Sequence, residues 1–135
     1  MSRTLHPASP FNESYDLPAL CQVEPALQAY VYTTKRGEQS VRFEQPAAVR
    51  LLNQALLRHH FALRWYEVPA TALCPAVPGR LDYLLYLQDF LCQLHGKKPK
   101  TKQFRLLDIG CGANLIYSVL AVQACRWQVV ASDIS

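Results

Sequence analysis

The sequence predicts an α/β protein in which a helical N-terminal region precedes one β-α-β unit. Three observations indicate this class. Residues 46–63 have the apolar spacing of an amphipathic helix, and residues 81–94 are apolar around most of a helix surface. Residues 104–132 contain two apolar runs that flank a glycine-rich turn and an apolar helical segment. With 135 residues, 50% of them hydrophobic and 18% charged, the composition is that of a globular chain and excludes a disordered or fibrous one.

Residues 1–45 give the weakest structural signals. Residues 1–18 are rich in Pro, Ser and Asn and lack periodicity, which predicts an irregular segment laid over a surface. Residues 24–32 are helix-like at their start and ambiguous afterwards. Alternation of apolar and polar residues over 40–43 predicts a short strand, which follows a turn at Gly37.

The first well-defined helix is predicted over residues 46–63. A proline opens it, as is common at the first helical position. Val49, Leu52, Leu56 and Leu63 recur at spacings of three, four and seven, and polar residues lie off this stripe. We therefore expect one buried face along this helix.

A proline-rich connection and a second helix are expected next. Residues 68–80 contain three prolines and a glycine, which predicts an extended connection without regular structure. The helix over 81–94 is expected to be buried on more than one face and to end at Gly96. Its aromatic residues, and one in the last strand, are expected in the core and not on a base-stacking surface: Tyr83, Tyr86, Phe90 and Trp127.

Most of the positive charge is local. The formal net charge is +4, and residues 97–105 alone carry five positive charges and no negative one. Two interpretations are open for the lysines at 97, 98, 100 and 102. They can contact phosphates and release counterions, or they can keep a solvated linker open by self-repulsion.

The β-α-β unit is predicted as a strand over 104–109, a helix over 113–124 and a strand over 127–132. This order places the carboxyl ends of two parallel strands at one edge, where nucleotide-like ligands bind. The sequence therefore predicts a ligand site after residue 109 and after residue 132.

The residues at this edge have matching chemistry. Gly110 and Gly112 allow a tight turn and a close approach of backbone to ligand. Free N–H groups near Asn114, at the expected start of the helix, can face polar ligand atoms. Asp133 follows the second strand and can accept hydrogen bonds from the two hydroxyls of a ribose.

Two classes of cofactor use this arrangement. A dinucleotide fingerprint requires Gly or Ala at the position of Leu115, which disfavours NAD. Methyltransferases that use S-adenosylmethionine have an acidic residue, x, Gly, x, Gly, and Asp108 provides the acidic position here. A purely structural glycine turn remains the alternative.

Longer segments make the comparison specific. The chain contains "LHP" at 5–7, "YDLPAL" at 15–20, "PAAVRLLNQALL" at 46–57, "LCPAVPGRLDYLLYLQDFL" at 73–91, "LLDIGCGANLIY" at 106–117 and "SDI" at 132–134. In order and spacing these segments resemble the start of the bacterial 23S ribosomal RNA adenine-N6 methyltransferases, the RlmF family. The resemblance covers nearly the whole chain. It implies a family-specific helical extension at 1–96, a basic linker at 97–103 and the opening, at 104–135, of a Rossmann-like S-adenosylmethionine-binding domain that these residues leave incomplete.

The resemblance also implies site residues and partners. Arg80, Gly110, Asn114 and Asp133 match positions that line the S-adenosylmethionine pocket in the family, with Arg80 near the methionine carboxylate. From the residues alone, Arg80 is better explained as a surface arginine that flanks the second helix. The implied cofactor is S-adenosylmethionine and the implied substrate is 23S ribosomal RNA.

Two departures from the family pattern bear on function. Ser118 stands where relatives commonly have proline, which we interpret as a detail of the helix. The family's catalytic motif, Asn-Pro-Pro and an aromatic residue, does not occur in these 135 residues, so no catalytic residue is assigned. We therefore expect the N-terminal part of an RNA adenine-N6 methyltransferase, inactive by itself. The alternative is a truncated, non-catalytic accessory module that binds RNA or protein.

Other functional classes find little support. The four histidines have no i, i+4 pairing, and the five cysteines are scattered without a C-x-x-C pair, so no metal site or disulfide framework is expected. The N-terminus lacks an apolar signal segment, and the longest apolar run is too short to cross a bilayer. We expect a cytoplasmic protein without a membrane partner.

Overall fold

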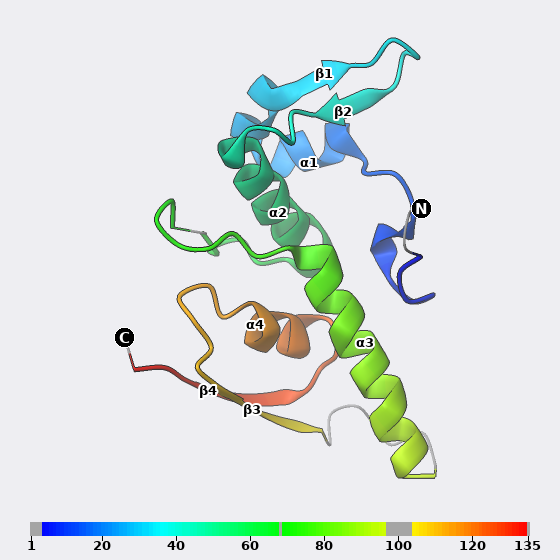
Figure 1. Ribbon diagram of the computed structural model, residues 1–135, viewed down its shortest axis with the longest axis vertical. Helices are drawn as coiled ribbons and strands as arrows, with labels where there is room; N and C mark the ends of the chain where they lie inside the picture. The colour runs from blue at the N-terminus through cyan, green and yellow to red at the C-terminus, as the bar shows by residue number, and fades with distance from the viewer. Residues whose placement is uncertain (1–3, 68, 97–103, 135) are drawn as a thin grey trace. The chain divides into compact units, whose positions relative to one another are not determined.

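The computed structural model describes residues 4–67, 69–96 and 104–134 (Figure 1). The chain divides into two compact units, which are described separately below. The helical unit is Ser14–Pro75, and the β-α-β unit comprises Met1–Glu13 and Ala76–Ser135. The boundaries of these two units differ from those of the domains expected from the sequence, 1–96 and 104–135. The division into those expected domains stays a prediction. The basic linker expected at 97–103 lies outside the described residues.

The helical unit contains two short helices, a hairpin and one long helix. In chain order they are α1 (Leu17–Val23), the 3-10 helix η2 (Pro25–Tyr30), β1 (Val31–Thr33), β2 (Gln39–Val41) and α2 (Pro46–Phe61). β1 and β2 pair antiparallel, with Val31 opposite Val41. Gly37 has a positive φ of 80° in the turn between them, as the sequence predicts.

α2 confirms the helix expected over 46–63 and ends two residues earlier. Ala62 adopts the left-handed conformation, and its N–H bonds the Leu57 carbonyl to close the last turn. α2 packs on α1 and η2, and every residue from 52 to 57 is buried, so the helix is covered on more sides than the single face expected from the sequence. Burial of each leucine side chain contributes about 2 kcal/mol, so the middle of α2 organises the unit.

Two short helices show that residues 1–18 are more regular than expected. The Oγ of Ser9 accepts a bond from the Phe11 N–H at 3.2 Å and caps the 3-10 helix η1 (Pro10–Asn12). Asp16 caps α1 in the same way, through the N–H of Ala19 at 3.1 Å. Helices of three and seven residues are too short for periodicity to reveal. Residues 4–9 and 13–16 are irregular, as expected.

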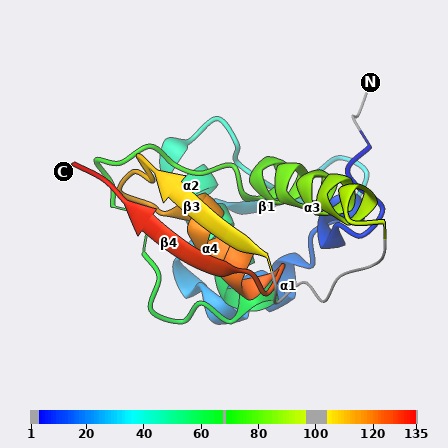
Figure 2. The same cartoon turned by 90° about the horizontal axis from the view of Figure 1, so that it is seen from below.

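The β-α-β unit contains α3 (Val77–Leu94), β3 (Arg105–Ile109), α4 (Ile116–Gln123) and β4 (Gln128–Ser132), in addition to η1. β3 and β4 pair in parallel, from Arg105 opposite Gln128 to Ile109 opposite Ser132. α4 lies on one face of this pair and also packs on α3 (Figure 2). The strand, helix, strand order predicted from the sequence is confirmed.

α3 begins at Val77, so the expectation that residues 77–80 lack regular structure is wrong. Pro78 lies in the first helical turn, where its missing N–H costs no intrahelical bond. The helix also buries a narrower face than expected, with Val77, Leu81 and Leu84 inside. Of the four aromatic residues expected in the core, only Trp127 is buried. The other three are more than half exposed: Tyr83, Tyr86 and Phe90.

The N-terminal segment is attached to α3 through His6. The backbone N–H of His6 donates to the Asp82 carboxylate, and its Nε2 lies 2.8 Å from Oδ2 of Asp89. The imidazole meets the Tyr86 ring edge to face, with centroids 4.7 Å apart. His6 is buried, so this polar cluster fixes the segment on the helix.

One face of the β3–β4 pair is apolar and exposed. Leu107, Ile109 and Val130 are 62%, 78% and 66% exposed, while Leu106 and Asp108 on the other face are half-buried. A parallel pair with helices on both faces would bury both rows. In the described part of the chain, no helix combines the length and apolar content needed to span a bilayer.

Candidate functional site

The candidate site is the edge of the β-α-β unit where β3 and β4 end together. Because Ile109 is paired with Ser132, the next residues, Gly110 and Asp133, begin at the same edge. The N–H groups of Gly110 and Cys111 both donate to the Ser132 carbonyl, at 2.8 and 3.1 Å. These bonds hold the start of the glycine turn against the end of β4.

The turn requires glycine at two positions because of its backbone conformation. Gly110 and Gly112 have φ of 71° and 70°, which side chains rarely permit. A Cβ built at either position meets no atom within 4 Å, so each glycine backbone borders open space. The space beside the two glycines is therefore open, so that a ligand can lie directly against the backbone of the turn.

Asp133 is held by the same turn. Its Oδ2 accepts from the Gly112 N–H at 2.7 Å, and its Oδ1 accepts from the Ile134 N–H at 2.7 Å. The exposed Asp133 carboxylate is thus oriented by the backbone at a position suited to a ribose diol.

α4 begins at Ile116, three residues later than expected. Leu115 precedes it with a positive φ of 53°, and Oδ1 of Asn114 accepts from the Ile116 N–H at 3.1 Å. The Asn114 side chain therefore forms a local turn with the first residue of α4, and the helix start expected near Asn114 lies at Ile116 instead. This bond places the Asn114 side chain at the exit of the glycine turn.

Asp108 is engaged by a residue whose role the sequence did not reveal. Oγ of the buried Ser118 donates to Oδ2 of Asp108 at 2.7 Å. This bond joins β3 to the first turn of α4 beneath the glycine turn. From the sequence Ser118 was interpreted as a detail of the helix, because no pattern predicts a partner ten residues away.

Arg80 lies in the first turn of α3 and is directed at α4. Its guanidinium carbon is 5.5 Å from the centroid of the Tyr117 ring, and Nη1 is 3.4 Å from the tyrosine hydroxyl. The interpretation from residues alone, an arginine that only flanks the helix, does not include this contact. A cavity of about 500 Å³ is lined by Leu5, Gly79, Arg80, Asp82, Tyr83, Tyr86 and Tyr117.

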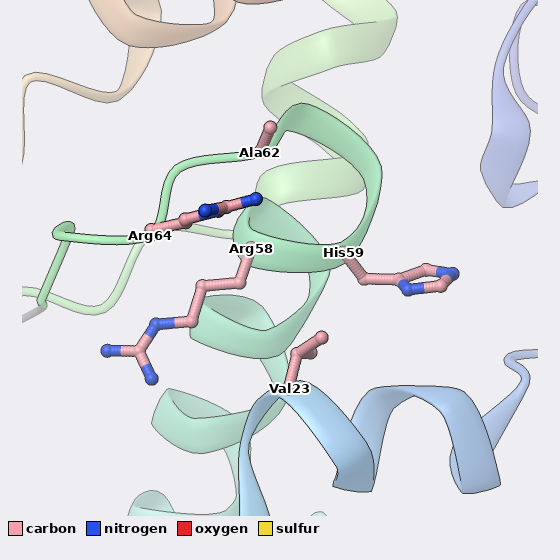
Figure 3. Close-up of a pocket in the computed structure, with 5 residues that line it drawn as sticks. All are labelled: Val23, Arg58, His59, Ala62 and Arg64. Carbon is pink, nitrogen blue, oxygen red and sulfur yellow. The ribbon is translucent and has the colours of Figure 1, made fainter.

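A second cavity, of about 370 Å³, lies in the helical unit at the end of α2 (Figure 3). It is lined by Val23, Arg58, His59, Ala62 and Arg64. Figure 3 shows the Arg58 side chain on one side of α2 and the His59 imidazole on the other.

The charge of Arg58 is already compensated. Its Nη1 lies 2.7 Å from Oε2 of Glu24, which also accepts from Nε2 of Gln54 at 2.7 Å. Both Glu24 and Gln54 are buried, so this network links η2 to α2. We interpret the group as structural, since the half-buried Arg58 is already paired with the buried Glu24 carboxylate.

Metal and thiol chemistry have little basis in the geometry. Among the residues that the structure describes, no three His, Cys, Asp or Glu side chains form a metal-binding group. The absence of a metal nevertheless stays a prediction. Burial raises the pKa of the Cys125 thiol to about 11, which makes it unreactive at neutral pH.

Comparison with known proteins decides the family. A family model described as RNA methyltransferase matches residues 1–135. The chain belongs to this RNA methyltransferase family. A curated member, ribosomal RNA large subunit methyltransferase F from Klebsiella pneumoniae (strain 342), is 47% identical over 131 residues. That match covers 97% of this chain and 42% of the relative, so the chain spans about two fifths of the relative's length.

Solved structures agree with the family assignment. The N-terminal domain of human METTL16 superposes with a TM-score of 0.82 at 30% identity, over 100% of this chain and 50% of that one. The same domain in complex with SAH gives a TM-score of 0.81 at 30% identity, over 98% of this chain and 50% of that one. The chain therefore has the α/β fold of a methyltransferase domain, as the resemblance implies.

Proposed function

We propose that this chain forms the cofactor-binding start of an enzyme that methylates N6 of an adenine in 23S ribosomal RNA, with S-adenosylmethionine as methyl donor. The single observation that supports the cofactor most strongly is the Asp133 carboxylate, held on the Gly112 N–H at the shared edge of β3 and β4. SAH in the METTL16 complex is S-adenosylmethionine without its transferable methyl group. The name of the Klebsiella relative supports ribosomal RNA as substrate.

The residues at the glycine turn fit the parts of this cofactor. Asp133 would accept hydrogen bonds from the ribose hydroxyls, and Gly110 would let the ligand approach the backbone. Asn114 would line the pocket at the exit of the turn, and Arg80 would bind the methionine carboxylate. S-adenosylmethionine, when bound, supplies an activated methyl group on a sulfonium. The proposed task of this chain is to bind and orient that cofactor.

The β-α-β unit is proposed to open a Rossmann-like domain that continues beyond these strands. The parallel pairing and the single crossover helix support this interpretation. The exposed apolar row that includes Leu107, Ile109 and Val130 supports it as well, since doubly covered parallel sheets bury such rows. Residues 1–135 by themselves are proposed to be inactive, because they contain no Asn-Pro-Pro-aromatic motif.

A methylation assay tests the proposal. It uses a protein of the relatives' full length that includes this chain, called the full-length protein below. The protein is incubated with unmodified 23S ribosomal RNA and methyl-labelled S-adenosylmethionine, and the nucleosides are analysed by mass spectrometry. We expect labelled N6-methyladenosine, consistent with a cytoplasmic enzyme that acts on ribosomal RNA.

The same assay separates the alternatives. Label on another nucleoside, or on protein, would contradict the proposed reaction. RNA binding without any methyl transfer would instead favour the accessory module considered above. Residues 1–135 alone are expected to transfer no label, and turnover by them would show that the cofactor-binding start suffices for catalysis.

A further inference from the structure

Arg80 and Tyr117 join α3 to the helix that follows the glycine turn. The two helices α3 and α4 pack together, and Arg80 and Tyr117 each lie in the first turn of their helix. We infer that Tyr117 is a positioning residue that holds the Arg80 guanidinium for a carboxylate on the ligand. This inference rests on the proposed function, because the ligand is taken to be S-adenosylmethionine.

The geometry identifies how Tyr117 would act. The Arg80 side chain is exposed and long, so it loses rotamer freedom whenever it is fixed for a ligand. The ring of Tyr117 lies within the 6 Å range of a cation–π contact, at 5.5 Å from the guanidinium carbon. The contact of Nη1 with the hydroxyl is longer than a good hydrogen bond, at 3.4 Å. The ring face therefore contributes more than the hydroxyl.

A second tyrosine supports the first. The Tyr83 ring meets the Tyr117 ring edge to face, with centroids 5.6 Å apart. Tyr83 lies three residues after Arg80 on α3, so both project from the same side of that helix. The Tyr117 ring thus contacts both Arg80 and Tyr83, two residues of α3. These two contacts restrict the rotamers of Tyr117.

The remaining donors of Arg80 suit a carboxylate. A guanidinium has five N–H donors in a planar fork, and the recorded tyrosine contact engages one nitrogen. Asp82, the carboxylate in the same cavity lining, is buried and accepts the His6 backbone N–H. Arg80 therefore contributes the cation of this cavity, which is open to an anionic group of matching planar shape.

The test compares two ligands that differ only at the amino-acid end. SAH has the methionine-derived carboxylate, whereas methylthioadenosine has the same nucleoside without it. Binding of each is measured by calorimetry on the full-length protein. Tyr117→Leu is expected to raise the Kd for SAH roughly three- to tenfold and to leave the Kd for methylthioadenosine within about twofold. Tyr117→Phe, which retains the ring, is expected to lose less SAH affinity than Tyr117→Leu.

A double variant and a matched control complete the design. With Arg80→Ala in place, Tyr117→Leu is expected to cause no further loss of SAH affinity. The matched control is Tyr32→Leu in the helical unit, where the Arg42 guanidinium carbon lies 5.2 Å from the centroid of the Tyr32 ring. This variant is expected to leave the affinities for SAH and methylthioadenosine unchanged.

Four outcomes contradict the inference or the proposed function in distinguishable ways. Equal loss of both ligands in Tyr117→Leu would show a general structural role. Unchanged SAH affinity in Tyr117→Leu, together with a loss in Arg80→Ala, would show that Arg80 needs no positioning. Unchanged SAH affinity in Arg80→Ala would remove Arg80 from the proposed site, and absence of SAH binding to the unsubstituted protein would refute the proposed function itself.

Discussion

The carboxylate of Asp133 accepts a hydrogen bond of 2.7 Å from the backbone N–H of Gly112, 21 residues earlier in the chain. This bond connects the residue after β4 with the turn after β3. The position of the acid and the conformation of the glycine turn therefore depend on each other. Changes in the turn should affect the acid, and changes in the acid should affect ligand binding.

Substitution of Gly112 tests the conformational requirement of the turn. Gly112→Ala is expected to lower the free energy of unfolding of the β-α-β unit by about 1 to 2 kcal/mol, because φ is +70° and an added Cβ meets no atom within 4 Å. The cost is therefore backbone strain and not a clash. Urea denaturation followed by Trp127 fluorescence, in a Trp65→Phe background, measures it, since Trp127 is buried and Trp65 is 95% exposed.

Gly79 provides the matched control for this substitution. It has no positive φ, and a Cβ there also meets no atom within 4 Å. Gly79→Ala in the first turn of α3 is expected to stabilise by about 0.4 to 1 kcal/mol. Equal destabilisation by both alanines would show that strain at φ +70° is not what the glycine turn avoids.

The buried pair of Glu24 and Arg58 makes a stability prediction in the helical unit. Their atoms lie 2.7 Å apart, with side chains 9% and 18% exposed. Glu24→Gln leaves the half-buried arginine its longer ion pair with Glu67, at 3.9 Å, in place of the short one, and is expected to cost about 3 kcal/mol. Amide hydrogen exchange along α2 is the measurement, and Glu38→Gln, at an exposed position in the hairpin, is the control.

The effects of substituting Glu24 and Arg58 on stability should also be non-additive. Replacing both charges, with Arg58→Met added to Glu24→Gln, is expected to recover part of the lost protection. A double variant less stable than Glu24→Gln alone would mean that Arg58 stabilises the unit through packing and not through its charge partner.

The free energy of unfolding is expected to depend on pH through His60. Burial, and then the charge of neighbouring His59, lowers the pKa of His60 from its usual value of 6.5. The unfolded chain therefore binds a proton at His60 more readily than the folded chain, so stability is retained above pH 6.5 and falls as the pH drops below it. Urea midpoints at pH 7.5 and pH 5.5, about one unit either side of the usual pKa, would reveal the loss. His60→Gln should reduce the difference between the two midpoints, and an unchanged difference would assign it to other groups.

Spacing predicted which residues meet at the shared edge of β3 and β4. Gly110 and Asp133 come directly after two apolar runs, and parallel strands bring such positions to one edge. The contact of Arg80 with Tyr117 and the bond of Ser118 to Asp108 depend on how α4 packs against α3 and β3, which no local pattern encodes. Placement of Arg80 near a site was expected only from the family resemblance.

Some elements were mispredicted for definite physical reasons. Pro78 was interpreted as a helix breaker, although a proline in the first turn removes no hydrogen bond. Tyr83 and Tyr86 were expected in the core because of their apolar rings, but only the α3 face that includes Leu81 and Leu84 is buried. Hydrophobicity alone does not tell which of several apolar faces is packed.

The most direct test of the account is calorimetric titration of S-adenosylmethionine into the full-length protein and its Asp133→Ala variant. The substitution is expected to weaken binding by about 1 to 3 kcal/mol, since it removes a hydrogen-bonded charge from the ribose position. Glu13→Ala, at an exposed residue of the same unit, is the control, and circular dichroism confirms that each variant is folded. Weaker binding in Asp133→Ala alone would support the cofactor site at the glycine turn. A folded Asp133→Ala protein with unchanged affinity for S-adenosylmethionine would contradict it.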